Sequence, residues 1–214
     1  MSLEKNLKNA LAELRKEKEI KFDQSVDLAI NLKKFDNKKT PLNLFIFLPH
    51  KVKDKKICAF LESKNKGLET ITKDEFKKYS DKKELKKLVK GFDFFVSQSS
   101  LMANVATVFG RVLGPAGKMP SPQLGILTNV NEKEIEILKE RINKSVRIRT
   151  KEASIKLSVG KQSMKDEEIT DNIVSIYNAV LKALPKEREN IKNIEIKFTM
   201  TKPVKITEDG NGQQ

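Results

Sequence analysis

Hydrophobic positions follow a helical period at the start of the chain and a strand period soon after it. Leucines recur every three or four positions between residues 3 and 14, which predicts an amphipathic helix. From residue 25 to residue 32 apolar and polar positions alternate, which predicts a strand with one buried face. The alternation returns late in the chain, so strands are predicted over 146–149, 154–159 and 193–199, with a helix over 166–184.

The middle of the chain has a different pattern. Residues 57–61 and 93–96 are short and almost wholly apolar, as in strands that are buried on both faces. Segments with a helical stripe alternate with them, over 81–89, 104–113 and 131–142. Alternation of buried strands with helices is typical of an α/β unit with a mainly parallel sheet.

Half-polar strands near both ends of the chain therefore flank an α/β middle. We predict a discontinuous α+β domain formed by residues 1–51 and 144–214, with an inserted α/β domain formed by residues 52–143. The chain would cross between the domains near residues 49–53 and 143–145. Two such crossings permit a hinge motion of one domain against the other.

The charge balance favours a polyanionic partner. The 214 residues include 43 Lys and Arg against 29 Asp and Glu, a formal net charge of +14 at pH 7. Nucleic acid is the commonest partner of so basic a protein, although lysine also serves solubility and is enriched in heat-adapted proteins. The first residues lack the apolar core of a signal peptide, and the longest apolar runs, such as 44–48, are too short to span a membrane. We expect a cytoplasmic protein with no membrane partner.

Several kinds of chemistry are excluded by composition. The chain has one histidine, His50, and one cysteine, Cys58, so a disulfide, most metal sites and most nucleophile triads are ruled out. The segment 110–119 is rich in glycine but has the wrong spacing for a phosphate-binding loop, and Met119 stands where the magnesium-binding hydroxyl belongs. We expect no catalytic residue, no metal and no cofactor, and hence a protein that is not an enzyme.

The same glycine-rich segment carries a resemblance. Residues 110–122 read GRVLGPAGKMPSP, which resembles the signature of the ribosomal protein L-one family. Residues 21–27, 158–161 and 198–204 resemble further segments of that family in the same order, and Asp171-Asn172-Ile173 resembles part of its last helix. The resemblance covers most of the chain.

The resemblance implies both a fold and a role. The family's fold is a discontinuous α+β domain with an inserted Rossmann-like α/β domain. Its members bind large-subunit ribosomal RNA and form the mobile stalk beside the exit site, where deacylated tRNA leaves. They also commonly bind their own messenger RNA and repress its translation, so the implied partners are ribosomal RNA, exit-site tRNA and that messenger, bound by a monomer.

The chain departs from the family pattern in three places. Thr201 stands where the family often has glycine, and a side chain there could narrow the approach of the backbone to RNA. Ala116 stands where a basic residue is frequent. The chain starts at its first helix, without the longer extension of bacterial members, and so is more similar to archaeal ones.

Residue chemistry and the resemblance together indicate an RNA-binding site in the terminal domain. Small polar groups on strands suit ribose hydroxyls and base edges, long cations suit phosphates, and an aromatic ring can stack on a base. The predicted RNA-binding residues are Lys21, Phe22, Ser25, Asp27, Arg147, Arg149, Lys156, Ser158, Lys161, Thr199, Met200 and Thr201.

Structural interpretations stay open for some of these residues. Phe22 could cap the core, Met200 has the core parity of its strand, and Arg147 and Arg149 could form a solvated strand face. In the inserted domain, one set of residues either faces tRNA or ribosomal RNA or only turns the chain. That set is Gly110, Arg111, Gly114, Gly117, Lys118, Met119 and Pro120.

Three other functions compete with the ribosomal one. A free translational repressor would use the same surface on messenger RNA. An enzyme could use the α/β domain on a nucleotide, although the phosphate motif is missing. A generic basic module would bind duplex DNA as well as RNA.

Overall fold

The protein divides into two compact units. A terminal unit contains Met1–Lys53 and Lys144–Gln214, and an inserted unit contains Asp54–Asn143. The first expected boundary, after residue 51, lies just before the observed one after residue 53, and the second is the same. The computed structural model describes residues 2–16, 21–36, 40–65, 67–128, 131–150 and 152–206.

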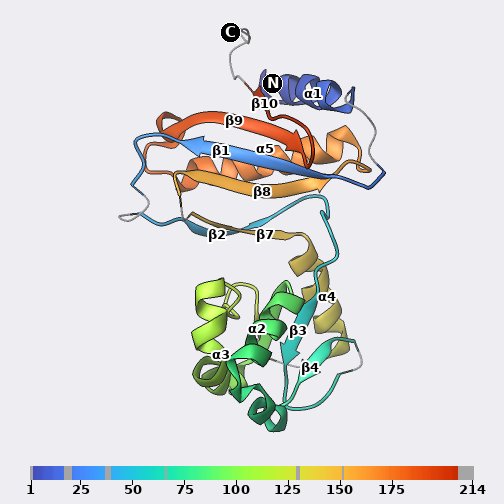
Figure 1. Cartoon of the computed structure of the whole chain (residues 1–214), viewed down its shortest axis with the longest axis vertical. Helices are drawn as coiled ribbons and strands as arrows, with labels where there is room; N and C mark the ends of the chain where they lie inside the picture. The colour runs from blue at the N-terminus through green and yellow to red at the C-terminus, as the bar shows by residue number, and fades with distance from the viewer. Residues whose placement is uncertain are drawn as a thin grey trace. The chain divides into compact units, whose positions relative to one another are not determined.

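The terminal unit contains a four-stranded antiparallel sheet and two long helices (Figure 1). The strand order is β10-β9-β1-β8, so the first strand of the chain lies between two late ones. The helices are α1 (Ser2–Arg15) and α5 (Asp166–Ala183), and a short 3-10 helix, η3 (Glu187–Asn190), leads into β9. The strands are β1 (Ser25–Leu32), β8 (Ser154–Lys161), β9 (Ile191–Phe198) and β10 (Val204–Ile206).

One face of this sheet forms the core of the unit. Alternate residues of β1, among them Val26, Leu28 and Ile30, are fully buried in one cluster with the apolar stripes of α1 and α5. The intervening residues of β1 are only partly buried. Figure 1 shows α5 behind the sheet, so the face toward the viewer is the one that carries the polar positions of the alternation.

A second, two-stranded sheet extends the same core. Strands β2 (Asn43–Phe47) and β7 (Ser145–Arg149) pair antiparallel, with Phe45 opposite Arg147. Ile46 and Ile148 are buried in the cluster that also contains the stripe of α5.

The inserted unit has a parallel sheet of order β4-β3-β5-β6. Its strands are β3 (Ile57–Phe60), β4 (Glu69–Ile71), β5 (Phe94–Gln98) and β6 (Ile126–Leu127). Its helices are η1 (Lys73–Ser80), α2 (Lys82–Gly91), η2 (Ser99–Leu101), α3 (Met102–Ala116) and α4 (Glu132–Asn143), of which η1 and η2 are 3-10 helices.

Both faces of the parallel sheet are covered, which explains why its strands lack alternation. On one face Phe60 lies 4.8 Å from Phe109 of α3 between ring centroids, within a cluster that includes α2 residues. On the other face Ala59 and Val96 pack in a cluster with residues of α4. The predicted mixture of helices with parallel and antiparallel strands is thereby confirmed.

The glycine-rich segment is mostly helical, which corrects an expectation. The sequence predicted that the helix would end at residue 113 and be followed by a loop, but α3 continues to Ala116. Val105, Phe109 and Leu113 form a fully buried stripe along it, and burial of three such side chains outweighs about 1 kcal/mol for each helical glycine. A Cβ atom added at Gly110 or Gly114 would meet nothing within 4 Å, so neither glycine is required by a close contact.

Candidate RNA-binding surface

The surface begins where strand β1 starts and strand β9 ends. The two strands are antiparallel, and Val26 pairs with Phe198. One position further, the Ser25 backbone N–H donates to Thr199 Oγ1 at 3.2 Å, and the Thr199 hydroxyl donates to the Ser25 carbonyl at 3.4 Å. The Thr199 side chain therefore replaces the next backbone pair of the ladder and holds the two strand ends together.

Thr199 lies within a tight turn from Phe198 to Thr201. The Thr201 backbone N–H donates to the Phe198 carbonyl at 3.2 Å, and Thr201 Oγ1 accepts from the Phe198 N–H at 2.9 Å. Thr201 is only 9% exposed, whereas Met200 between them is 67% exposed. The RNA-facing role of Thr201 stays a prediction, but its burial favours a structural role, because its hydroxyl closes the turn from inside. Met200 is not a core residue, because strand β9 and its alternation of buried and exposed positions both end at Phe198.

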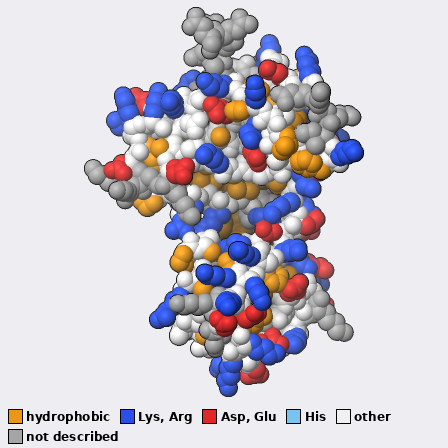
Figure 2. Space-filling model, in the orientation of Figure 1, with side chains coloured by type: hydrophobic (Ala, Val, Ile, Leu, Met, Phe, Trp, Pro, Cys, Tyr) orange, Lys and Arg blue, Asp and Glu red, His pale blue; other side chains and the backbone are white. Residues whose placement is uncertain are grey.

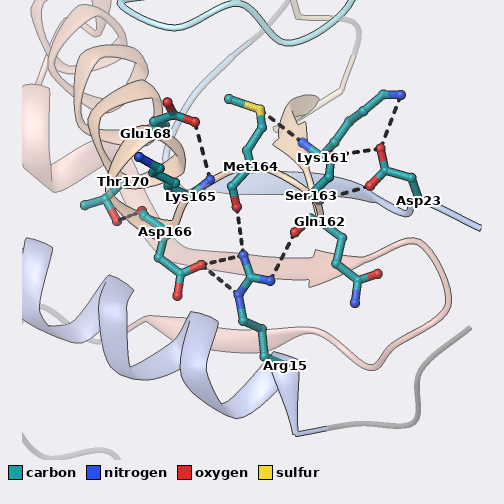
Figure 3. Close-up of polar contacts among 10 residues, drawn as sticks. All are labelled: Arg15, Asp23, Lys161, Gln162, Ser163, Met164, Lys165, Asp166, Glu168 and Thr170. Atoms are coloured by element: carbon teal, nitrogen blue, oxygen red, sulfur yellow. Dashed lines mark hydrogen bonds and ion pairs between the residues drawn. The ribbon is translucent and has the colours of Figure 1, made fainter.

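The residues before β1 are held against the connection between β8 and α5 (Figure 3). Asp23 accepts hydrogen bonds from the Ser163 backbone N–H and hydroxyl, both at 3.0 Å, and lies 3.4 Å from Lys161 Nζ. Partial desolvation alone would raise the pKa of Asp23, but the hydrogen bonds from Ser163 and then Lys161 lower it below its ordinary value. Phe22, next to Asp23, is 50% exposed and does not cap the core.

Arg15, in the last turn of α1, fixes the same connection from its other side (Figure 3). Its guanidinium donates to Asp166 Oδ1 at 2.8 Å, to the Gln162 carbonyl at 3.0 Å and to the Met164 carbonyl at 2.9 Å. A planar guanidinium with five donors suits three acceptors in one plane. The segment that carries Lys161 is thus ordered by contacts to α1, α5 and Asp23.

A groove of about 550 Å³ lies on the partly polar face of the four-stranded sheet. Asp27 of β1 lies between Ser158 of β8 and Lys197 of β9 in the strand register. The groove thus combines cations and carboxylates with a mainly apolar lining. It is lined by Asp27, Leu28, Ala29, Lys156, Leu157, Ser158, Glu195, Lys197 and Pro203.

The carboxylates of the groove oppose its positive charge locally. Burial raises the pKa of Asp27, and the positive charge of Lys197 offsets part of that effect. A carboxylate here repels phosphate oxygens but accepts protons from ribose hydroxyls and from base amino groups. The Ser158 hydroxyl donates to the Val26 carbonyl at 3.4 Å, so this hydroxyl already has a hydrogen-bond acceptor within the protein.

Two predicted residues lie on a different sheet. Arg147 and Arg149 belong to β7, which pairs with β2 and not with the strands that carry Ser25 and Thr199. The Arg147 guanidinium lies 5.1 Å from the Phe45 ring centroid, and its Nε donates to Asn43 Oδ1 at 3.0 Å. The structure therefore does not bring the arginines into the set around Thr199.

The remaining predicted residues are spread along this side of the unit, since Lys161 pairs with Ser25 at the start of β1 but Lys156 pairs with Ala29 in its middle. Lys21, Lys156 and Lys161 are exposed, and Ser25 is partly buried. Figure 2 shows lysine and arginine side chains over much of the visible face of the terminal unit, with acidic side chains scattered among them. Long cations at this surface can reach phosphates while shorter groups contact sugars and bases.

A metal site and a membrane span each need a recognisable arrangement of side chains. Among the described residues, no cluster of three or more His, Cys, Asp or Glu side chains could hold a metal ion. No described helix is both long and apolar enough to cross a membrane. Burial raises the pKa of the Cys58 thiol to about 12, so it is protonated at neutral pH and is a poor nucleophile.

Comparison with known proteins places the chain in a family. Residues 14–202 match the sequence pattern of the ribosomal protein L1p/L10e family. The chain belongs to this family. The large ribosomal subunit protein uL1 of Thermofilum pendens is 37% identical, and the match covers 97% of this chain and 94% of that protein. The uL1 proteins of Nanoarchaeum equitans (34% identical, 90% and 95% covered) and Thermoplasma volcanium (36%, 91% and 90%) are similarly related.

These relatives are archaeal, and their names describe a protein of the large ribosomal subunit. The sequence-based assignment to the L-one family is confirmed by the match and by the relatives. The prediction that the chain is not an enzyme is confirmed by the same relatives, which are named as ribosomal proteins.

The family's glycine-rich signature forms the end of helix α3 in this L1p/L10e member. Gly117 ends α3 with a positive φ of 70°, and the Gly117 and Lys118 N–H groups close the helix on Gly114 and Leu113 carbonyls. Lys118 Nζ donates to the Val89 and Phe92 carbonyls, each at 2.7 Å. Of the two interpretations left open for this set, these contacts favour the structural one for Lys118.

The rest of that set divides between the core and the surface. Met119 packs against the core that contains Phe60, and Pro120 is buried. Arg111 is exposed on α3.

Sequence reasoning missed some residues of the surface. Glu195 and Lys197 have the same parity as Thr199 on β9, so the alternation alone could have found them. Arg15 and Gln24 had no such signal, because their partners lie 138 or more positions away in sequence.

Proposed function

We propose that this chain is a structural component of the large ribosomal subunit that binds large-subunit ribosomal RNA through the end of its four-stranded sheet. The observation that carries the proposal is the pairing of Thr199 with Ser25, which rigidly presents Phe22 and Met200 as exposed apolar side chains on a basic unit. Membership of the L1p/L10e family and the printed names of the relatives support it.

The geometry suits structured RNA. An A-form helix presents a shallow minor groove, 2′-hydroxyls and phosphates, and bases in bulges can be stacked on aromatic rings. Phe22 offers such a ring, and Met200 offers a flexible apolar contact to a ribose. Because Thr199 fixes the distance between the two strand ends, both contacts are preorganised and little entropy is lost on binding.

The charged residues of the surface favour different parts of the RNA at different positions. Lys21 and Lys161 attract phosphates near the strand ends, where Lys161 shares its charge with Asp23. Lys156 attracts phosphate beside the groove that it lines. Asp27 and Glu195 disfavour phosphate in the groove and favour donors such as ribose hydroxyls or base amino groups. The RNA is thereby held in one orientation.

We propose a more specific role by analogy with the family. The bound ribosomal RNA forms the mobile stalk, and the protein assists release of deacylated tRNA from the exit site. The inserted unit is Rossmann-like in arrangement, with a parallel sheet between helices, and Arg111 is its candidate contact to tRNA. The protein acts on cytoplasmic ribosomes and is a monomer when free.

We also propose repression of its own messenger RNA. A messenger hairpin with the shape of the ribosomal site would fit the same surface, because the contacts around Thr199 recognise backbone shape and few base edges. The two RNAs would then compete for one site.

A binding titration tests the proposal. The protein is titrated with a large-subunit stalk RNA fragment and with a scrambled hairpin of equal length, at low and high salt. We expect the stalk complex to persist at salt concentrations that dissociate the scrambled hairpin, because only non-specific binding rests wholly on counterion release. Equal, salt-sensitive binding to both RNAs would refute specific recognition. Competition by a hairpin from the leader of its own messenger tests the repressor role.

A further inference from the structure

Gln24 is a buried polar residue at the centre of the candidate RNA-binding surface. It precedes Ser25 and is 1% exposed, although its neighbours Phe22 and Asp23 are exposed. A buried amide group needs hydrogen-bond partners, since an unsatisfied one costs about 1–3 kcal/mol. The partners of Gln24 identify what its side chain holds in place.

Both ends of the Gln24 amide are used. Its Oε1 accepts from the Met200 backbone N–H at 3.0 Å, and its Nε2 donates to Gln162 Oε1 at 3.3 Å. The Gln24 backbone carbonyl also accepts from the Gln162 N–H at 2.7 Å. Gln162 is in turn held by Arg15, whose guanidinium donates to its carbonyl (Figure 3).

The Met200 N–H is the group that makes this arrangement relevant to binding. The turn around it is closed on one side by Thr199 and Thr201, and Gln24 supplies the contact from the side of the β8–α5 connection. The Met200 side chain is 67% exposed, so the fixed backbone carries a group that is free to contact a ligand. Met200 lies beyond the ladder, because β9 ends at Phe198.

We propose that Gln24 is a positioning residue for RNA binding, which sets the place of the Met200 turn relative to Phe22 through the Met200 N–H bond. This proposal rests on the proposed RNA-binding function. It assigns to Gln24 no contact with RNA, since the side chain is buried. Its effect is on the preorganisation of two exposed contacts, and therefore on affinity for structured RNA more than on attraction to any polyanion.

The chain offers a matched control. Asn190 is also 1% exposed and also makes several hydrogen bonds, to the Lys186 N–H and to the Lys33 and Lys34 carbonyls. It precedes the first residue of β9, whereas Thr199 follows the last, so it lies at the opposite end of the sheet. Asn190→Leu removes a buried amide of comparable burial without touching the candidate surface.

The experiment compares Gln24→Met, Gln24→Glu and Asn190→Leu in the full-length protein. Gln24→Met keeps the volume but removes the acceptor, whereas Gln24→Glu keeps an acceptor for Met200 and can accept from a rotated Gln162 amide. We measure hydrogen exchange of the Met200 amide, thermal unfolding, and affinity for the stalk RNA fragment and for the scrambled hairpin.

We expect Gln24→Met to speed Met200 exchange and to weaken stalk binding about tenfold, which corresponds to loss of about one hydrogen bond. Binding of the scrambled hairpin stays unchanged, and Gln24→Glu restores stalk binding to within about threefold of the wild-type protein. Asn190→Leu lowers the melting temperature but leaves stalk binding unchanged.

Stalk affinity that is unchanged in Gln24→Met overturns the proposal, and so does an equal loss in Gln24→Met and Asn190→Leu, because affinity would then follow stability alone. Failure of the proposed function gives a different result. In that case the wild-type protein itself does not distinguish the stalk fragment from the scrambled hairpin.

Discussion

Arg15 and Asp166 join the last turn of helix α1 to the first turn of helix α5. Two guanidinium nitrogens of Arg15 lie 2.7 and 2.8 Å from the same carboxylate oxygen of Asp166. The side chains are 34% and 36% exposed, so the pair is only partly screened by water. The negative charge also lies at the N-terminus of α5, where the helix dipole favours it.

Arg15→Ala should destabilise the terminal unit. The variant loses the ion pair and the two hydrogen bonds to main-chain carbonyls, so we expect the free energy of unfolding to fall by about 2 kcal/mol. Urea denaturation followed by circular dichroism measures the change. Arg15→Lys should recover less than half of it, because an ammonium group cannot reach three acceptors in one plane.

A matched control lies on the same pair of helices. Lys8 is 3.7 Å from Glu167, and both side chains are more than half exposed. Lys8→Ala should change the free energy of unfolding by less than about 0.5 kcal/mol, as exposed pairs usually do. If the two alanine variants are equally destabilised, the loss reflects helix charge and not the geometry of Arg15.

The exposed end of the sheet should tolerate substitutions that RNA binding does not. Thr199→Ala removes the hydroxyl that pairs with Ser25, and Phe22→Ala removes a half-exposed ring. We expect each to weaken binding of the stalk fragment about tenfold, with the melting temperature changed by only a few degrees. Filter binding and calorimetry measure the two quantities. Unchanged affinity in both variants would contradict the assigned surface.

Thr201 should matter to the turn and not to RNA contact. Thr201→Val keeps the shape but leaves the Phe198 N–H without its 2.9 Å partner, so we expect a loss of about 1–3 kcal/mol in unfolding free energy. Thr201→Ser keeps the hydroxyl and should lose less than about 1 kcal/mol. Chemical denaturation compares them. A serine variant as unstable as the valine variant would assign the effect to the methyl group.

The periodic parts of the fold could be predicted from sequence because their burial depends on local spacing. Buried and partly exposed residues alternate along the whole of strand β1, and an apolar stripe follows all five turns of α5. The bounds of both were therefore predicted to within about one residue. Strands β4, β6 and β10 were not found. They have two or three residues each, too few for a period to be recognised.

Contacts outside the simple hydrophobic period account for what the sequence left open or missed at the site. Met200 was predicted to bind RNA, with burial left open by its place in the strand alternation. That alternation ends with strand β9 at Phe198, and the following turn is set by the Thr201 hydroxyl. Glycine and proline indicated a loop after residue 113, but a buried stripe on α3 continued the helix. On α3 tertiary contacts outweighed a local rule, whereas at Met200 a local turn ended the alternation.

Asp27 should reduce the stability of the free protein. Its pKa is raised from 3.8 by burial, so the folded state binds the proton more tightly than the unfolded state does. The stabilising contribution of the protonated form is present below pH 3.8 and is lost as the pH rises through the raised value. Asp27→Asn should therefore melt at a higher temperature than the wild-type protein at pH 7, and the difference should vanish at pH 3.

The same variant should bind RNA less selectively. Asparagine cannot repel phosphate, so the groove should accept the scrambled hairpin more readily, and the preference for the stalk fragment should fall several-fold. Glu152→Gln is the control, because Glu152 is exposed, lies 3.9 Å from Lys156 and is not among the groove residues. A lower melting temperature for Asp27→Asn at pH 7 would show that the Lys197 charge outweighs desolvation.

Lys118 separates the structural from the RNA-facing interpretation of the glycine-rich signature. Its ammonium group donates to two carbonyls at the C-terminal end of α2, at 2.7 Å each, where the helix dipole also favours a cation. Lys118→Met should therefore destabilise the inserted unit by about 2 kcal/mol, and leave binding of the stalk fragment unchanged. Hydrogen exchange of the α2 amides measures the stability of that unit. Lys87→Met provides the control, because Lys87 is 76% exposed and forms a surface ion pair with Glu84 at 2.9 Å. This variant should change stability by less than about 0.5 kcal/mol. Weaker RNA binding with unchanged exchange in Lys118→Met would show instead that this lysine leaves its carbonyl partners to contact RNA.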